Sequence, residues 1–313
     1  MSNALEGRVA IVTGAGRGIG KAIAEQLHAL GASVVVADNG TSIGGDGADP
    51  SVARETAQAL GKRALAFEQS IATPGAASLL VARAVKEFGG IDIVVNNAAI
   101  LRDAFIFKTE PGNWDAVIRN NLSGPAYLIA AASAAMREQG KSGRGGKSYE
   151  WGRIVNIVSS AGLYGNFGQA AYASAKAGLV GLTRVTAMDL QRAAITCNAV
   201  APFARTRVTD TIQPANEAQK TYKERAVRIA PSHVATLVAA LCVPSAGKIT
   251  GQIFGVRGRE VFLFSQARPI AQLVNKTGDW AVEDLSKKIS GELSAKFTDL
   301  GTDLEAFNTE PFV

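Results

Sequence analysis

Short apolar runs alternate with stretches of helical period from residue 8 to residue 256. Each run is apolar at nearly every position, as expected for strands buried on both faces because helices cover both sides of a parallel sheet. The alternation predicts an α/β fold. The runs lie at residues 8–12, 33–37, 64–67, 91–95, 154–158, 196–200 and 252–256.

The stretches between these runs predict helices through their apolar stripes and their end signals. Ile19, Ile23 and Leu27 share one helical face, and Gly31 follows as a stop signal. Pro111 suits the first turn of a later helix. The expected helices cover residues 19–30, 52–60, 74–88, 111–136, 171–190, 233–243 and 280–297.

Three segments lack a clear period. Residues 39–51 and 139–152 are polar and Gly-rich, so we expect two surface loops, the second one exposed and mobile. Residues 203–231 follow a strand end and are long, as a substrate lid would be, and part of this segment can be helical.

The first expected strand leads directly into a glycine-rich turn, T-G-A-G-R-G-I-G, from Thr13 to Gly20. A helix and a second buried strand follow, and that strand closes with Asp38, 18 residues after Gly20. Glycines let the backbone approach a pyrophosphate, whose charge the helix N-terminus stabilises, and an acid at this distance binds a ribose 2′-hydroxyl. The arrangement predicts a dinucleotide site.

Asp38 also indicates which dinucleotide binds. A carboxylate at that position repels a 2′-phosphate, so NAD is favoured over NADP. Arg17 argues the other way, since a cation near the turn could bind that phosphate. A pyrophosphate contact or a solvated charge would explain Arg17 equally well.

Two asparagine segments are further candidates. Asn96-Asn97-Ala98-Ala99 follows the run at 91–95, and small residues with amides at a strand's carboxyl end suit a ligand crevice, although an Asx turn is the alternative. Asn121 lies in the middle of an expected helix, where Asn is a poor helix former. We expect a local distortion there, with a freed carbonyl that holds water, or else a simple polar contact.

Ser159, Tyr172 and Lys176 are the candidate catalytic residues. Tyr172 and Lys176 are four positions apart and would share one helix face, and Ser159 lies thirteen positions before Tyr172, across a Gly-rich turn. A phenol titrates near about pH 10, and an adjacent ammonium favours phenolate, so we expect a lowered pKa for Tyr172. The phenol could then exchange a proton with an alcohol or carbonyl oxygen that the serine holds. Taken alone, Y-x-x-x-K is common on helices and often means only packing and a solvated charge.

The composition is ordinary for a globular protein: 313 residues, 47% hydrophobic and 19% charged. No apolar run approaches the roughly 18 residues of a membrane span, and we expect no secretory signal. Cys197 and Cys242 fall in expected core elements, which fits packing in a reducing compartment such as the cytoplasm. We expect no metal site and no membrane partner.

The formal charge of +6 comes from scattered residues. There is no dense basic run with interleaved aromatic residues, so we expect no nucleic-acid partner. An acidic small substrate, such as a phosphate-bearing thioester, would account for the charge, and so would no specific partner at all.

Taken together, these motifs resemble the short-chain dehydrogenase/reductase family over about residues 7–256. The resemblance implies a single-domain, Rossmann-type, doubly wound parallel sheet of about seven strands with helices on both faces. It also implies a homodimer or a homotetramer. The matching residues are Thr13-Gly14, Gly18-Ile19-Gly20, Asn96-Asn97-Ala98, Asn121, Ser159, Tyr172 and Lys176.

A narrower likeness is to the (3R)-hydroxyacyl-CoA dehydrogenase domain of peroxisomal multifunctional enzyme type 2 and to its bacterial stand-alone relatives. Residues 34–40, 96–103 and 164–172 carry it, together with the tail after Gly258. In that group NAD oxidises a 3-hydroxyacyl-CoA to the 3-ketoacyl-CoA, and some bacterial members act on steroid side chains. We therefore expect a dehydrogenase domain at 1–257 and a helical extension at 258–313 that packs on this domain or on a partner subunit.

The family's pattern also implies roles for single residues. Tyr172 would be the proton acceptor, Lys176 would lower its pKa and bind the nicotinamide ribose, and Ser159 would position the substrate oxygen. Asn121 would support a proton-relay water. The cofactor residues would be Gly14, Arg17, Gly18, Ile19, Gly20, Asp38, Gln69, Asn96, Ala98 and Pro202, together with Tyr172 and Lys176.

Four features depart from the family's pattern. Ala99 replaces a common Gly, and Gln69 stands where an Asp commonly meets adenine. Phe203 replaces the common Gly after Pro202, which alters the loop on the nicotinamide side. The segment 205–207 is unusually basic, so it either meets a CoA phosphate or is a solvated loop.

Other functions stay open at this stage. One is an NADPH-dependent 3-ketoacyl-carrier-protein reductase, and another is a steroid or polyol dehydrogenase. A catalytically silent sensor could bind dinucleotide without turnover, but such proteins typically lack the tyrosine or the lysine, and both are present here.

Overall fold

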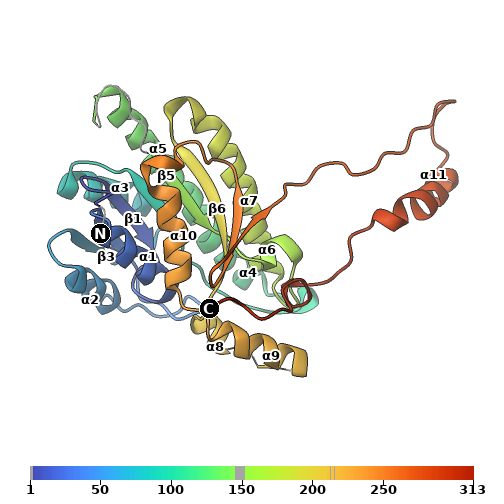
Figure 1. Cartoon of the computed structure of the whole chain (residues 1–313), viewed down its shortest axis with the longest axis horizontal. Helices are drawn as coiled ribbons and strands as arrows, with labels where there is room; N and C mark the ends of the chain where they lie inside the picture. The colour runs from blue at the N-terminus through green and yellow to red at the C-terminus, as the bar shows by residue number, and fades with distance from the viewer. Residues whose placement is uncertain (1–2, 145–151, 212, 215) are drawn as a thin grey trace.

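The computed structural model describes residues 3–144, 152–211, 213–214 and 216–313 (Figure 1). Eight strands form one sheet in the order β3-β2-β1-β4-β5-β6-β7-β8. The first seven run parallel, and β8 pairs antiparallel with β7. The strands are β1 (Val9–Thr13), β2 (Ser33–Ala37), β3 (Ala64–Phe67), β4 (Ile93–Asn96), β5 (Arg153–Ile157), β6 (Thr196–Phe203), β7 (Ile253–Arg257) and β8 (Glu260–Phe264).

Helices connect the parallel strands and cover both faces of the sheet (Figure 1). Short 3₁₀ turns lie at Ile106–Lys108, Gln191–Ala193, Pro244–Ala246 and Ser294–Lys296, and π turns at Arg119–Ser123 and Ile289–Leu293. The α-helices are α1 (Gly18–Ala29), α2 (Ser51–Leu60), α3 (Pro74–Phe88), α4 (Pro111–Ile118), α5 (Gly124–Lys141), α6 (Ala161–Tyr164), α7 (Ala170–Leu190), α8 (Arg207–Thr211), α9 (Glu217–Ala226), α10 (Ser232–Cys242), α11 (Val282–Lys288) and α12 (Asp303–Ala306).

The apolar strands divide their side chains between two cores. Ala10 and Val12 of β1 lie in a cluster with residues of α1, α2 and α10, whereas Val9 and Ile11 lie in a cluster with residues of α3, α5 and α7. All four side chains are at most 2% exposed. Both faces of the sheet are therefore dry, which is why the strand sequences show no polar alternation. The sequence-based prediction of a doubly wound α/β fold is confirmed.

The sheet order sets the position of the crevice. The chain proceeds outward from β1 through β2 to β3, and then returns to form β4 on the other side of β1. Crossovers at this reversal leave on opposite faces, so a gap opens beyond the carboxyl ends of β1 and β4. The glycine-rich turn and the Asn96–Ala99 segment both lie there, at the ends of these two strands.

Most sequence-based boundaries are within a few residues of the structure, and the differences are local. The expected helix 111–136 is α4, a π turn and α5, which continues to Lys141. Strand β6 extends to Phe203, and the segment 203–231 contains α8 and α9. Of the expected loop 139–152, residues 145–151 lie outside the described residues.

The sequence analysis missed β8. Gly258, at φ +61°, turns the chain back after β7, and β8 then pairs antiparallel with it. The strand lies at the sheet edge, and its burial alternates, so Val261 and Leu263 are 58% and 65% exposed. Residues 261–264 read Val-Phe-Leu-Phe and are as apolar as a buried strand, but the expected parallel sheet ended at residue 256 and this run was not assigned to it.

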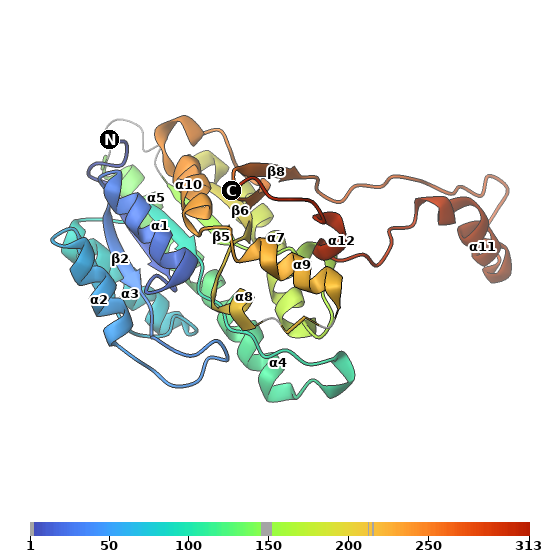
Figure 2. The same cartoon turned by 60° about the horizontal axis from the view of Figure 1, so that its bottom comes forward.

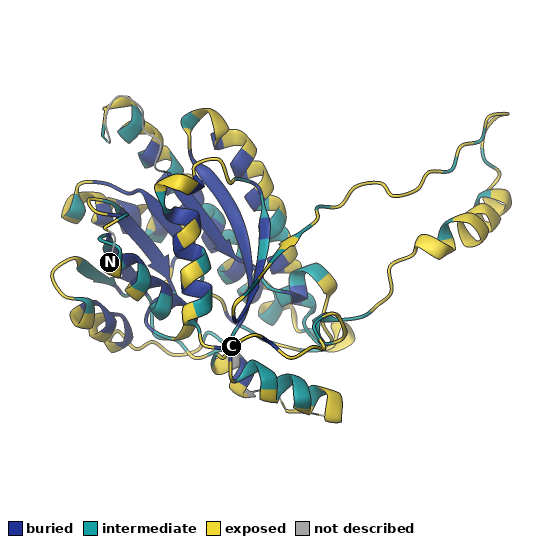
Figure 3. Cartoon of the chain, in the orientation of Figure 1, coloured by how far each residue is buried: buried dark blue, intermediate teal, exposed yellow. Residues whose placement is uncertain are grey.

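The tail after β8 has two parts. Residues 265–301, here called the arm, project from the body and carry α11 (Figures 1 and 2). The arm is exposed along most of its length (Figure 3). The predicted helix 280–297 is shorter than expected, because α11 ends at Lys288 and passes into a π turn and a 3₁₀ turn.

Residues 302–313, here called the strap, return to the body. They contain α12 and lie against α9 (Figure 2). Within the described parts of the chain, no helix combines the length and the apolar character that crossing a membrane requires.

Candidate active site

One cavity of about 710 Å³ opens beyond the carboxyl ends of β1, β4, β5 and β6. Residues from the glycine-rich turn line one part of it, and Ser159, Tyr172 and Lys176 line another. Residues of α9 and of the strap complete the wall. A cavity of this size lies in the range of about 300–1,000 Å³ that is usual for small-molecule sites.

The glycine-rich turn is packed so closely that side chains are excluded. A Cβ on Gly20 would lie 2.1 Å from the carbonyl oxygen of Gly14, and one on Gly14 would lie 2.9 Å from Ala98 Cα. Gly18 differs, because its φ is +54° and a Cβ there would meet nothing within 4 Å. Gly18 therefore borders open space in the cavity, and only its backbone conformation calls for glycine.

The N-terminus of α1 faces this cavity without a protein cap. Arg17 at the N-cap position makes no side-chain capping hydrogen bond, and no acidic residue lies in the first turn. Gly18, Ile19 and Gly20 all line the cavity. Free backbone N–H groups and the positive end of the helix dipole are what a pyrophosphate needs, so this end of the cavity fits a dinucleotide.

Thr13 and Asn97 hold the turn in place, and neither had been assigned a role from the sequence. The Thr13 hydroxyl accepts hydrogen bonds from the backbone N–H groups of Asn97 (2.9 Å) and Ala98 (3.0 Å). The Asn97 amide donates to the Thr13 and Gly14 carbonyl oxygens at 2.9 and 3.2 Å. The two strand ends are thereby fixed to each other.

Asn96, by contrast, is not among the residues that line the cavity. Its side chain is 2% exposed and donates to Asn156 Oδ1 at 2.8 Å. Asn156 in turn donates to the Thr183 hydroxyl at 2.8 Å. Asn96 thus takes part in a buried polar network between β4, β5 and α7 rather than in the adenosine contact expected for it; Ala98, predicted with it, does line the cavity.

Asp38 is held in one orientation at the end of β2. Its Oδ2 accepts from Gly16 N at 2.9 Å and its Oδ1 from Gly40 N at 2.8 Å. Arg17 and Arg207 both line the cavity near it, and burial, followed by the charge of Arg17, lowers the pKa of Arg207 while Asp38 raises it. One fixed carboxylate and two cations therefore line this part of the cavity, and Arg17 also pairs with Asp49 at 3.9 Å. Gln69 and Pro202 also line the cavity, as expected for cofactor residues.

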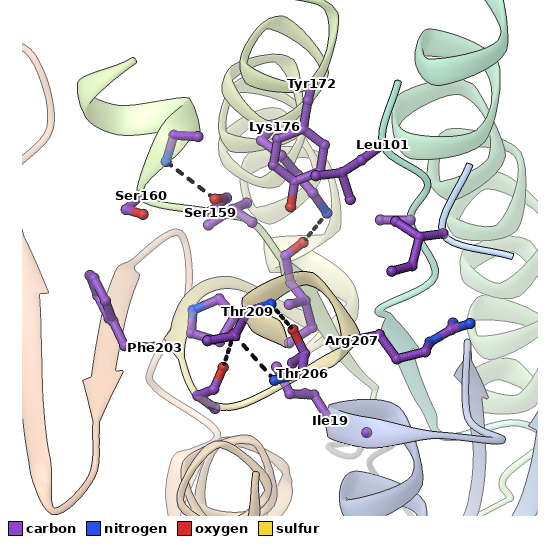
Figure 4. A pocket seen from close by; sticks show the side chains of 18 of the residues that line it. Ile19, Leu101, Ser159, Ser160, Tyr172, Lys176, Phe203, Thr206, Arg207 and Thr209 are labelled. Atoms are coloured by element: carbon purple, nitrogen blue, oxygen red, sulfur yellow. Dashed lines mark hydrogen bonds between the residues drawn. The ribbon is translucent and has the colours of Figure 1, made fainter. Parts of the chain in front are cut away.

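Ser159, Tyr172 and Lys176 meet in the cavity as the sequence analysis predicted (Figure 4). Tyr172 and Lys176 lie on the first turns of α7, and Ser159 follows β5. The Lys176 ammonium donates to the Ile157 carbonyl oxygen at 2.7 Å and lies 5.7 Å from the centre of the Tyr172 ring. The Ser159 hydroxyl accepts from Ala161 N at 3.2 Å and shares a hydrogen bond with the Tyr172 phenol.

The sequence analysis predicted a lowered pKa for Tyr172, and this direction was wrong. Burial raises this pKa to about 12; the hydrogen bond with Ser159 lowers it, and the charge of Asp103 raises it further. Lys176 has its pKa lowered to about 8 because it too is buried. Desolvation is thus the largest effect on both groups, and the electrostatic effect of Lys176 on Tyr172, which the sequence argument had placed first, is not among the causes of either shift.

Asn121 lies in the π turn Arg119–Ser123, so the expected local distortion is confirmed. Its side chain is fully buried, with Oδ1 accepting from Ile100 N at 2.9 Å and Nδ2 donating to Ile100 O at 2.8 Å. Asn121 does not line the cavity. Its side chain therefore braces the segment after β4, and a role in a proton relay stays a proposal.

A sequence model of the family described as short chain dehydrogenase matches residues 8–220. The chain belongs to the short-chain dehydrogenase/reductase family. Its oxidoreductase chemistry, its Rossmann-type sheet and its nicotinamide dinucleotide cofactor follow from that membership.

Relatives of two kinds occur among the similar proteins. Hydroxyacyl-CoA dehydrogenase ChsB1 of Mycobacterium tuberculosis is 40% identical, with 83% of this chain and 80% of the relative covered. Peroxisomal multifunctional enzyme type 2 of Mus musculus is 35% identical over 87% of this chain, which spans 34% of that longer protein. 3-Oxoacyl-(acyl-carrier-protein) reductase FabG of Vibrio cholerae is also 35% identical, over 81% of this chain and 97% of the relative.

A solved structure extends the comparison to the tail. The crystal structure of a short chain dehydrogenase from Mycobacterium avium has a TM-score of 0.77 and 37% identity. The alignment covers 93% of this chain and 96% of that one. The likeness to short-chain dehydrogenases therefore spans nearly the whole chain, well beyond residues 8–220 that match the family model.

The buried ammonium leads to a prediction about stability. Lys176 titrates at about 8 in the folded chain and at 10.5 when unperturbed, so between these values the unfolded chain binds more protons. The contribution of Lys176 to the free energy of unfolding should therefore rise with pH from about 8 to about 10, by about 3 kcal/mol, while the buried thiols of Cys197 and Cys242, whose pKa burial raises to about 12, act in the opposite direction above about pH 9. When urea unfolding is measured across that range, the difference between wild type and Lys176→Met should therefore grow with pH in favour of wild type.

Lys86→Met is the control, because Lys86 lies exposed on α3 and also loses an ammonium. It should follow the wild-type pH dependence. Parallel curves for wild type and Lys176→Met would contradict the lowered pKa.

Proposed function

We propose that the protein oxidises (3R)-3-hydroxyacyl-CoA thioesters to 3-ketoacyl-CoA with NAD as the hydride acceptor. The observation that carries the proposal is the single cavity in which Asp38 and the uncapped end of α1 lie with Ser159, Tyr172 and Lys176. One end suits a dinucleotide, and the other places a hydroxyl and a phenol where an alcohol would react.

The fixed carboxylate of Asp38 favours NAD. With both oxygens already oriented by backbone N–H groups, it can accept from a ribose 2′-hydroxyl without reorganising. A 2′-phosphate at the same place would meet its negative charge at short range. The charges of Arg17 and Arg207 act in the opposite direction, so the proposed preference for NAD depends on the carboxylate of Asp38.

The catalytic groups would act on the substrate oxygen. Bound NAD supplies the hydride acceptor for the carbinol hydrogen. The Ser159 hydroxyl holds the substrate oxygen, and Tyr172 accepts the hydroxyl proton, so the alcohol loses one hydride and one proton and becomes a ketone. Lys176 would bind the nicotinamide ribose, and the π turn at Asn121 would support a relay water.

An anionic thioester fits the remaining lining of the cavity. Arg17 and Arg207 are cations in the wall, and the chain carries a formal charge of +6; Arg225 and Arg257 also line the cavity but are paired with Glu310 and Glu260. Phe203 and Phe307 supply an apolar surface in the same cavity, with ring centres 4.6 Å apart. Cations attract the CoA phosphates while the aromatic rings suit an acyl chain. The mycobacterial relative, named a hydroxyacyl-CoA dehydrogenase, supports the same class of substrate.

The direct test is NADH formation by the purified protein. At about pH 8, wild type should reduce NAD with one or more (3R)-3-hydroxyacyl-CoA thioesters in a panel of chain lengths. Tyr172→Phe should lower kcat by roughly 10²–10⁴-fold, because the proton acceptor is lost, and should leave the affinity for NAD nearly unchanged.

Tyr127→Phe is the control for the loss of a phenol, since Tyr127 lies on α5 outside the cavity. It should keep wild-type kcat. Absence of NADH with every thioester would refute the substrate assignment. Loss of NAD binding in Tyr172→Phe would mean that the variant reports on the fold and not on the chemistry.

The preference for NAD should depend on one charge. Asp38→Asn removes the repulsion and leaves Arg17 and Arg207 in place, so the ratio of kcat/KM for NAD to that for NADP should fall by about tenfold or more. Asp115→Asn, on the exposed face of α4, should leave the ratio unchanged. A wild-type preference for NADP, or an unchanged ratio in Asp38→Asn, would overturn the role given to Asp38.

A 3-ketoacyl-carrier-protein reductase is the second candidate, and the similarity to the Vibrio cholerae reductase favours it. It would act in the opposite direction, with NADPH. The cofactor titration described above separates the two functions. Cys197 and Cys242 are free and buried, and they support a reducing compartment, for which we propose the cytoplasm.

We further infer that the protein is a homo-oligomer in which the arm packs on a partner subunit. The arm carries apolar side chains that its own body leaves open: Ile270, Val282 and Leu300 are 73%, 85% and 94% exposed. Both of its ends are fixed, one by β8 and one by the strap, so it cannot simply collapse onto the sheet. Exposed apolar surface of this kind marks an interaction site.

The test is the molar mass in solution. Wild type should elute as a dimer or tetramer by light scattering, and Val282→Asp with Leu300→Asp should shift it towards the monomer. Leu79→Asp, a similar change on the exposed side of α3, should not. A monomeric wild type would refute the inference.

A further inference from the structure

The strap enters the wall of the cavity although it is separated from the catalytic residues by more than a hundred positions. Asp303, Phe307 and Thr309 line the cavity together with Ser159 and Tyr172. The strap lies outside residues 8–220, which match the family model. Nothing in the family's shared motifs therefore accounts for its place in the site.

Asp303 fixes the beginning of the strap. Its Oδ2 accepts hydrogen bonds from the Ser160 hydroxyl at 2.6 Å and from the Tyr222 phenol at 3.1 Å. Ser160 is the neighbour of Ser159 in the chain, and Tyr222 lies on α9. One carboxylate oxygen thus connects the catalytic end of β5 with the helix that covers the cavity. Burial, followed by the charge of Asp303, raises the pKa of Tyr222, so the phenol stays a donor.

The end of the strap is held by arginines. Arg225 of α9 donates to Glu310 Oε2 at 3.1 Å and to Asn308 Oδ1 at 3.0 Å, and Arg228 also pairs with Glu310. Arg257 of β7 is 5% exposed and donates to the Phe307 carbonyl oxygen at 2.8 Å and to Thr309 Oγ1 at 2.8 Å. Helix α9 and strand β7 therefore hold the strap from two sides.

Between these two attachments, the ring of Phe307 packs into an aromatic cluster. Its centre lies 4.6 Å from that of Phe203, 5.1 Å from that of Phe262 and 6.2 Å from that of Tyr164. Phe203 is the residue that stands where the family commonly has a glycine after Pro202, so this departure supplies the ring against which Phe307 packs. Phe203 and Ser159 both line the cavity, and Figure 4 shows them apart from each other in it.

We propose that the strap is the selectivity element of the substrate site. Asp303 and Glu310 hold it against α9, and Phe307 then forms, with Phe203, the wall against which the apolar group next to the reacting carbon packs. Asp303 is a positioning residue and Phe307 a specificity-determining one. The proposal rests on the proposed function, since it takes the alcohol carbon to lie between Ser159 and Tyr172.

The first test changes the wall. Phe307→Ala should raise kcat/KM for the bulkiest thioesters relative to the shortest by roughly tenfold, which corresponds to about 1.4 kcal/mol. The KM for NAD should stay within about twofold, because the strap is remote from the uncapped end of α1. Phe307→Leu keeps an apolar side chain and should lie between wild type and Phe307→Ala. Phe297→Ala, on the arm of the same tail and 61% exposed, is the matched control and should keep the wild-type profile.

The second test releases the strap. Asp303→Ala should raise KM for the thioesters by about tenfold with little change in kcat, because the wall is displaced and the reacting groups are not. It should also raise hydrogen exchange in α9. Asp284→Ala, an exposed acid on α11, is the control and should change neither quantity.

The failure of the strap proposal must be distinguishable from the failure of the proposed function. For this reason the substrate panel includes free secondary alcohols and steroid alcohols beside the thioesters. If wild type oxidises only alcohols that are not thioesters, the proposed function is overturned. The size preference of the Phe307 variants is then measured with those alcohols, and that result decides the strap proposal. An unchanged size preference in Phe307→Ala and Phe307→Leu, with wild-type turnover intact, overturns the strap proposal alone. If wild type oxidises no alcohol, both are overturned.

Discussion

The structure depends on a buried ammonium at the end of β5. Lys176 is 2% exposed, and its Nζ donates to the Ile157 carbonyl oxygen at 2.7 Å. A charge removed from water is tolerated only when it has close partners, and even then its pKa shifts towards the neutral form. The carbonyl that holds Lys176 is the last of β5, so the ladder between β5 and β6 and the start of α7 must both be in register. The catalytic geometry is thus fixed by the sheet itself.

The polar residues near this ammonium act mostly on the scaffold. Asn96 and Asn156 connect β4 and β5 inside the sheet, and Asn121 holds both backbone groups of Ile100. Side-chain amides suit this work, because each can donate and accept across neighbouring chains. They place the segment after β4 opposite the one after β5. None of these three side chains lines the cavity.

The sequence predicted those parts of the site that are determined by residues close together in the chain. The glycine-rich turn, Asp38 and the spacing of Tyr172 and Lys176 were identified because a turn, a strand end and a helix each carry their own pattern. The direction of the Tyr172 pKa was wrong because burial is a property of the whole fold, and sequence proximity to Lys176 says nothing of it. Asn96 was placed in the cofactor site because two adjacent asparagines point to opposite sides of the chain, and their order alone does not tell which one faces the ligand.

The tail could not be predicted for a related reason. Asp303 meets Ser160 and Tyr222 only because the chain leaves at β8 and returns, and no spacing in the sequence encodes that closure. Closing the long arm costs entropy that grows slowly with its length, and the hydrogen bonds at Asp303 and the ion pairs at Glu310 oppose that cost. A partner subunit that ordered the arm would remove part of the same entropy. The two proposals, assembly through the arm and selectivity through the strap, therefore concern one continuous segment of the chain.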